Sequence, residues 1–217
     1  MINHEKIFEI CLKSFLRVVK IVNRRSFLQL AGLAAVGYLL DPTSLFEIQT
    51  TDAKKVSKPK IEQVSLYFSE LHPRENTETI VIHNSACKSI DDVSALEIHQ
   101  IHKNLGWAGI GYHFVIRKNG TIESGRALAA VGAHCYYHNE NSVGICLSGN
   151  FDNEQPTKKQ IKSLKNLTAW LCRKYNLDPK KDQTILGHRD LISGTSCPGS
   201  SMYPKLDDIR DFCIKKV

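Results

Sequence analysis

Short apolar runs alternate with amphipathic helical segments from residue 79 to the end of the chain, and this alternation constrains the fold more than any other feature. The runs TIVIHNSA (79–86) and SVGICLSGNF (142–151) are typical of strands covered on both faces. TKKQIKSLKNLTAWLCRKYN (157–176) carries isoleucine and leucine on one face and lysine on the other, so it predicts a long helix. Strands that alternate with helices predict an α/β fold, a single domain with a mixed, largely parallel central sheet and helices on both faces.

Four further segments fit this alternation. DDVSALEIHQIHKNLG (91–106) predicts a helix that begins at one of its two leading aspartates. GYHFVIRKNGTIESG (111–125) predicts a hairpin, because the Asn-Gly pair at 119–120 tolerates the positive φ angles of a tight turn. QTILGH (183–188) predicts a short strand, and KLDDIRDFCIKK (205–216) predicts a closing helix. The first of these helices is expected to bury its apolar positions, Val93, Leu96, Ile98, Ile101 and Leu105.

The N-terminal region is better explained as a targeting signal than as part of the fold. The pair Arg24 and Arg25 stands directly before an uncharged run, residues 26–40, and so resembles a twin-arginine export signal. That run is shorter than the ~20 residues that span a bilayer comfortably. We therefore expect residues 1–53 to be a signal or anchor with a linker, and residues 54–217 to be one exported domain.

The export signal implies a partner and a location. The partner is the twin-arginine translocon, and the location is the periplasm or cell envelope. If the signal is not cleaved, residues 26–40 would tether the domain to the outer face of the cytoplasmic membrane. An ordinary N-terminal helix of the fold is the alternative interpretation.

Charge and cysteine content limit the functional classes. The first 53 residues hold six basic and five acidic residues, so 23 basic and 17 acidic residues remain in the rest of the chain, a net charge of +6. A basic domain suits an anionic polymer such as nucleic acid or cell wall, although an ordinary solvated surface gives the same charge. Seven cysteines without any CxxC spacing argue against a small disulfide scaffold, and against a nucleic-acid-binding protein with a structural zinc finger.

Candidate metal ligands stand at the ends of two predicted strands. His83 ends the first strand, and ILGHRDLISGTSCPG (185–199) places His188 at a strand end and Cys197 in the loop that follows. The carboxyl ends of parallel strands gather functional groups at one edge of a sheet. Two histidines and a cysteine with a fourth position free are the ligand set of a catalytic zinc. From spacing alone, a hydrogen-bonded histidine or a small buried cysteine remains open at each position.

Four segments in succession carry a family resemblance: IVIHNSA, HKNLGWAGIGYHFVIRKNGTIESGR, VGAHCYYHNENSVGICLSGNF and LGHRDLISGTSCPG. Across residues 79–200 the chain resembles the zinc-dependent N-acetylmuramoyl-L-alanine amidases found among bacteriophage lysins and peptidoglycan-recognition proteins. The resemblance implies hydrolysis of the amide bond between N-acetylmuramic acid and L-alanine in peptidoglycan or muropeptides. It also implies Zn²⁺ as the cofactor, with His83, His188 and Cys197 as its ligands.

The same resemblance implies further catalytic groups. Tyr112 corresponds to a tyrosine that assists catalysis, as a hydrogen-bond donor to an oxyanion or to water, unless it is a strand aromatic packed beside Phe114 and Ile116. Thr195 stands where phage relatives carry lysine, and threonine brings no charge and cannot act as a base at neutral pH. Cys146 stands where other relatives carry a glutamate base. The identity of the proton-transfer group is therefore open.

Substrate-contacting candidates lie in or beside the same segments, and a structural role is an equal alternative for each: Asn84, Trp107, Arg126, His134 and Asn150. His99 and His102 are interpreted as solvent-facing or half-buried helix residues, and His113 as pointing to the face opposite Tyr112. The alternative function is a non-catalytic peptidoglycan-binding module. Relatives of that kind usually lack the cysteine ligand, which this chain retains at Cys197.

Overall fold

The computed structural model describes residues 56–86 and 92–217. The predicted export signal in residues 1–53 lies outside these residues, so it remains a prediction. No helix within the described ranges is long and apolar enough to cross a membrane.

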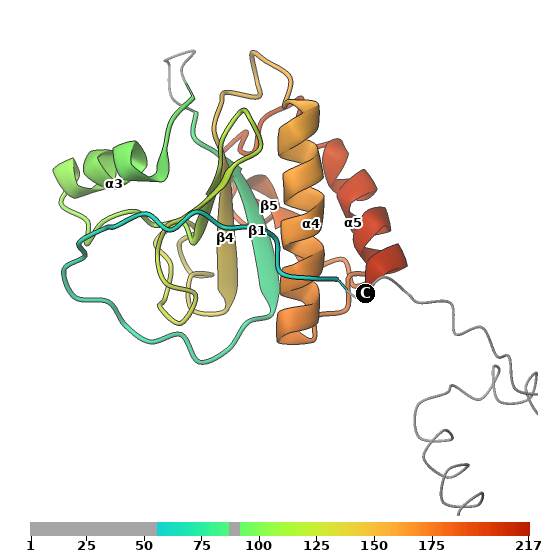
Figure 1. The fold of residues 1–217 in the computed structure, drawn as a ribbon, viewed down its shortest axis with the longest axis horizontal. Helices are drawn as coiled ribbons and strands as arrows, with labels where there is room; N and C mark the ends of the chain where they lie inside the picture. Colours follow the sequence, from blue (N-terminus) through green and yellow to red (C-terminus); the bar gives the residue numbers. More distant parts are fainter. Residues whose placement is uncertain (1–55, 87–91) are drawn as a thin grey trace, which may run out of the picture. The chain divides into compact units, whose positions relative to one another are not determined.

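A central sheet organises the described residues (Figure 1). Its five strands in this part of the chain are ordered β3-β2-β4-β1-β5. Strands β2, β4, β1 and β5 run parallel to one another, and β3 is antiparallel to β2. The predicted mixed, largely parallel sheet is therefore confirmed. The strand bounds are β1 Thr79–Asn84, β2 Phe114–Ile116, β3 Ile122–Ser124, β4 Ser142–Leu147 and β5 Ile185–Gly187.

Helices cover both faces of the sheet, as predicted. Helices α4 (Lys158–Tyr175) and α5 (Lys205–Lys216) pack side by side over one face (Figure 1). Helix α3 (Ala95–Asn104) contributes Ala95 and Ile98 to a separate cluster with the strand residues Val115 and Cys146. The core under α4 and α5 includes nine residues that are at most 1% exposed: Ile80, Ile82, Ile145, Leu147, Leu164, Leu167, Leu171, Leu206 and Ile209.

Local signals explain where the long helix starts and stops. Thr157 caps α4: its Oγ1 accepts a hydrogen bond from the backbone N–H of Gln160, and Gln160 Oε1 accepts one from the backbone N–H of Thr157. This reciprocal pairing satisfies two N–H groups that the first helical turn leaves open. Asn176 ends the helix in the left-handed conformation, with φ of 53°.

The start and the buried face of α3 differ from the prediction. Ser94, rather than either aspartate before it, caps the helix together with Glu97 in the same reciprocal arrangement. His99 lies on the buried face and is satisfied there, because its Nδ1 accepts from Ile110 N–H and its Nε2 donates to Tyr67 O. The prediction of burial is confirmed for Val93 and Ile98 but is wrong for three exposed residues, Leu96, Ile101 and Leu105.

Strand register determines where the functional groups meet. Ile82 of β1 pairs with Gly187 of β5, so His83 and His188 follow side by side at the same edge of the sheet. On its other side, β1 aligns His83 with Cys146 of β4. A one-residue slip in either pairing would move His83 to the opposite face of the sheet.

Candidate metal centre

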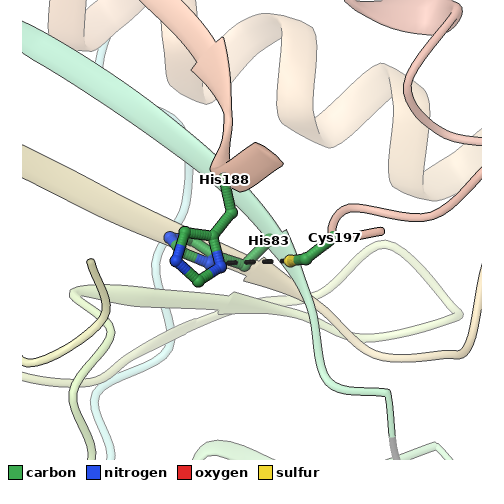
Figure 2. Close-up of side chains that lie close together, drawn as sticks. All are labelled: His83, His188 and Cys197. Carbon is green, nitrogen blue, oxygen red and sulfur yellow. Dashed lines mark hydrogen bonds between the residues drawn. The ribbon is translucent and has the colours of Figure 1, made fainter. Parts of the chain in front are cut away.

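Three side chains from separate elements converge at the carboxyl edge of the sheet. His83 belongs to β1, His188 opens the short 3₁₀ helix that follows β5, and Cys197 lies in the next loop (Figure 2). One ligand atom from each of the three lies within 4.8 Å of the other two. The His83 Nδ1 and Cys197 Sγ atoms are 3.7 Å apart, and the two imidazole centroids are 4.6 Å apart.

This donor set fits a zinc ion. Tetrahedral zinc with bonds of roughly 2.0 to 2.3 Å separates a nitrogen ligand from a sulfur ligand by about 3.6 Å. The 3.7 Å between His83 Nδ1 and Cys197 Sγ agrees with that separation. Two imidazoles and one thiolate also leave a fourth tetrahedral position for water or substrate. His83, His188 and Cys197 are therefore a candidate site for a catalytic metal.

Burial favours the neutral form of both imidazoles, which is the form that binds a metal. Desolvation lowers the pKa of His83, and the neighbouring His188 lowers it further. Desolvation also lowers the pKa of His188. Both rings are consequently neutral near pH 7, the state in which an imidazole offers a lone pair to a metal.

The cysteine behaves differently when no metal is bound. Burial raises the pKa of Cys197 to about 11, although a hydrogen bond from Asn84 N–H to Sγ, 3.4 Å long, favours the thiolate. The thiol therefore holds its proton at neutral pH until a cation displaces it. Metal binding at this centre is expected to release that proton.

A network of hydrogen bonds fixes the loop that carries Cys197. Thr195 Oγ1 accepts from Cys197 N–H at 3.1 Å, and Cys197 O accepts from Arg189 N–H at 2.9 Å. Asp152, in the turn after β4, accepts hydrogen bonds from both Ser196 and Ser200. Thr195 thus supports the geometry of the loop, and its predicted role in catalysis remains a prediction.

Tyr112 lies next to the candidate metal ligands. Its ring centroid is 5.1 Å from that of His83. Tyr112 precedes β2 and packs against the cluster that contains Val115, whereas Phe114 belongs to the core under α4 and α5. The alternative interpretation of Tyr112 as a strand aromatic packed beside Phe114 and Ile116 does not fit this packing, because both of those residues belong to the core under α4 and α5. Its position beside His83 suits the predicted catalytic role, which remains a prediction.

His102 is half-buried on α3, as predicted, and lies beside Trp107 and Tyr112. Its ring centroid is 4.5 Å from Trp107 and 5.7 Å from Tyr112. Its Nδ1 accepts from Gly111 N–H, so the proton of the neutral ring is on Nε2. Burial lowers its pKa to about 4, which keeps the ring neutral at physiological pH. The signal that could have identified it is its place in the segment HKNLGW, which also contains Trp107.

The structure places the predicted substrate-contacting residues in different settings. Trp107 is 44% exposed beside His102, so it is accessible to a ligand. Arg126 is buried and donates to three backbone carbonyl oxygens, those of Gly109, Ile110 and Val131. Asn150 accepts from Asp152 N–H within the turn after β4. For these three residues, substrate contact remains a prediction.

Asn84 and His134 lie closest to the candidate ligands. Asn84 is 5% exposed, and its backbone N–H donates to Cys197 Sγ. His134 is 8% exposed, with its Nδ1 3.1 Å from His83 Nε2. Contact of either residue with substrate also remains a prediction. His113 is buried as well, and both of its ring nitrogens bind backbone groups, Gly144 N–H and Ala130 O.

Comparisons with known proteins agree with this centre. The sequence profile of a family described as N-acetylmuramoyl-L-alanine amidase matches residues 73–200, which contain all three candidate metal ligands. The endolysin of Escherichia phage T7 is 43% identical over 130 residues, covering 58% of this chain and 82% of the endolysin. The endolysin of Enterobacteria phage T3 is 38% identical over 134 residues, covering 59% of this chain and 85% of that endolysin.

Solved structures also match the fold of this chain. N-acetylmuramoyl-L-alanine amidase LysC from Clostridium intestinale URNW matches with a TM-score of 0.64 at 37% identity, covering 71% of this chain and 97% of LysC. Wild-type Drosophila PGRP-LB matches with a TM-score of 0.60 at 28% identity, covering 68% of this chain and 92% of that chain.

Proposed function

This chain belongs to the N-acetylmuramoyl-L-alanine amidase family, and from that premise we propose that it hydrolyses its peptidoglycan substrate by zinc-dependent chemistry. The bond cleaved is the amide between N-acetylmuramic acid and L-alanine. The observation that carries the zinc dependence is the convergence of His83, His188 and Cys197, with 3.7 Å between His83 Nδ1 and Cys197 Sγ.

The ligand set suits an electrophilic centre. A zinc ion held here would polarise the amide carbonyl and lower the pKa of a water molecule towards ~7. His83 and His188 contribute no charge, and the Cys197 thiolate contributes one negative charge. A dication at this centre would therefore keep a net charge near +1.

The chain's own residues supply the remaining steps. Tyr112, whose ring lies 5.1 Å from that of His83, is placed to donate a hydrogen bond to the oxyanion that forms at the scissile carbonyl. A series of ring contacts leads away from the candidate metal centre: the His83 ring neighbours Tyr112, Tyr112 neighbours His102, and His102 neighbours Trp107. The exposed indole of Trp107 and the fixed Nε2–H of His102 suit the sugar or the stem peptide.

The experiment compares the full-length protein before and after zinc is removed by a chelator. Purified murein sacculi are the substrate, and released peptides with N-terminal alanine are the product. We expect activity to disappear with the metal and to return when zinc is added. Cys197→Ala should lose both zinc and activity, whereas the control Cys172→Ala, which removes a core thiol of α4, should keep both. Full activity of the chelated protein or of Cys197→Ala would contradict zinc dependence.

A binding module that does not cut peptidoglycan is the second candidate. The retention of Cys197 beside the two histidines disfavours it, because the complete ligand set is present. Sacculus binding by the zinc-loaded protein without release of peptides would support that candidate instead.

We also propose export through the twin-arginine translocon to the periplasm or cell envelope. Arg24 and Arg25 before the uncharged run 26–40 support this route. A peptidoglycan substrate supports it too, since that polymer lies outside the cytoplasmic membrane. A translocon that carries folded proteins would let zinc bind Cys197 before the chain enters an oxidising compartment.

A further inference from the structure

His134 contacts the buried side of a candidate metal ligand. The two ring nitrogens of His83 face different partners: Nδ1 lies 3.7 Å from Cys197 Sγ, and Nε2 lies 3.1 Å from His134 Nδ1. The rings of His83 and His134 meet edge to face, with centroids 5.0 Å apart and planes at 79°. His134 is only 8% exposed, so its ring offers little surface to a substrate.

Two glycines make the space that holds the His134 ring. A Cβ atom at Gly132 or at Gly144 would lie 2.5 Å from His134 Cδ2, a distance that real Cβ contacts essentially never show. Asn139 fixes the backbone of the same loop, because its Oδ1 accepts from the N–H of His134 at 2.8 Å. The ring is therefore confined to the position in which Nδ1 meets His83.

The direction of the hydrogen bond between the two histidines follows from metal binding. A neutral imidazole carries one proton, and the nitrogen that binds a metal must be the unprotonated one. If His83 Nδ1 is the ligand, its proton is on Nε2, and His134 Nδ1 must be the acceptor. Metal-binding histidines usually donate this second N–H to a carboxylate, a backbone carbonyl or water. Here the position is taken by another imidazole.

We propose that His134 is a positioning residue that accepts the Nε2–H of His83 and thereby directs the Nδ1 lone pair of His83 toward the zinc position. This inference rests on the proposed zinc-dependent function. It assigns His134 to the metal centre in place of contact with substrate.

The direction of this hydrogen bond also determines which nitrogen of His134 carries its own proton. Its own proton is then on Nε2, and that atom is buried without a hydrogen-bond partner among the residues that the structure describes. An unpaired buried donor is unfavourable. Replacing His134 by an apolar ring should therefore weaken zinc binding more than it weakens the metal-free fold.

The first test measures zinc affinity of the full-length protein by competition with a chromophoric chelator. His134→Phe removes the acceptor, and we expect zinc to bind about 10- to 100-fold more weakly. His134→Asn places an amide oxygen near the position of Nδ1 and should restore most of the affinity. Unchanged zinc affinity in His134→Phe, with a raised KM for muropeptide, would overturn the proposal in favour of substrate contact.

The second test needs no substitution. Nitrogen-15 NMR of the imidazoles in the wild-type, metal-free protein shows which nitrogen of His83 carries the proton. A proton on Nε2 supports the proposal, whereas a proton on Nδ1 would overturn it, because His134 would then be the donor. Absence of zinc binding by the wild-type protein would instead overturn the proposed zinc-dependent function, so the two failures are distinguishable.

Discussion

Acid should destabilise the folded chain through His113. This ring is 1% exposed, and burial is the main cause that lowers its pKa from 6.5 to about 3. In the unfolded chain the imidazole regains its ordinary pKa, so the unfolded state binds a proton first as the pH falls. The stabilisation is therefore complete above pH 6.5 and is lost progressively between pH 6.5 and about pH 3.

The magnitude follows from these two pKa values. Between pH 7 and pH 5, protonation of this one histidine in the unfolded chain alone lowers the free energy of unfolding by about 2 kcal/mol. The result is nearly the same for any folded-state pKa below about 4, because at pH 5 the folded ring is then almost entirely neutral. Burial also lowers the pKa values of His83 and His134, so the total loss for the metal-free protein should exceed this figure.

Urea unfolding of the full-length protein at pH 7 and pH 5, with a chelator to keep metal from the site, measures the loss. His113→Asn cannot be protonated, and its amide oxygen can still accept from Gly144 N–H, the bond that His113 Nδ1 makes now. We expect this variant to be less stable at pH 7 but to lose about 2 kcal/mol less than the parent on acidification. The control His72→Asn changes an exposed histidine and should keep the pH dependence of the parent. Equal losses in His113→Asn and the parent would refute the reasoning.

Three further predictions concern catalysis, the metal-binding loop and export. Tyr112→Phe removes the proposed oxyanion donor and should lower kcat by about 10²- to 10³-fold with zinc content unchanged, measured by peptide release from sacculi. Asp152→Ala removes the acceptor for Ser196 and Ser200, so the loop should loosen and zinc should bind about tenfold more weakly in a chelator competition. Changing Arg24 and Arg25 to lysine should block export of a reporter fused to residues 1–53, and unchanged export would contradict the twin-arginine route.

The sheet was predictable because each strand carries its own pattern. β1 and β4 are continuous apolar runs, and a parallel strand buried on both faces requires such a run. The face of α3 was not predictable from hydrophobicity. Its buried side includes His99, which becomes acceptable in the core only because Ile110 N–H and Tyr67 O satisfy both ring nitrogens. Those partners belong to other segments of the chain, so the pattern of residues within the helix does not predict them.

The convergence of the two candidate histidine ligands was predictable for a similar reason. His83 and His188 each stand directly at the end of an apolar strand, and parallel strands bring such ends to one edge. The place of His102 beside Tyr112 was not predicted, because a helical histidine without a ligand partner resembles an ordinary surface residue. Its neighbours Trp107 and Tyr112 lie on the following turn and strand entry, and only the folded chain brings the three rings together.

The roles of His113 and His134 show where sequence pattern stops being informative. Both histidines are buried and both belong to the segments that carry the family resemblance, yet their ring nitrogens face different partners. Those of His113 bind backbone groups and stabilise the fold, whereas Nδ1 of His134 faces the imidazole of a candidate metal ligand. The difference depends on which atoms face each ring nitrogen, and that is determined by strand register and by the space beside Gly144. A glycine in the middle of a buried strand is costly unless something requires its missing side chain, and here the His134 ring does.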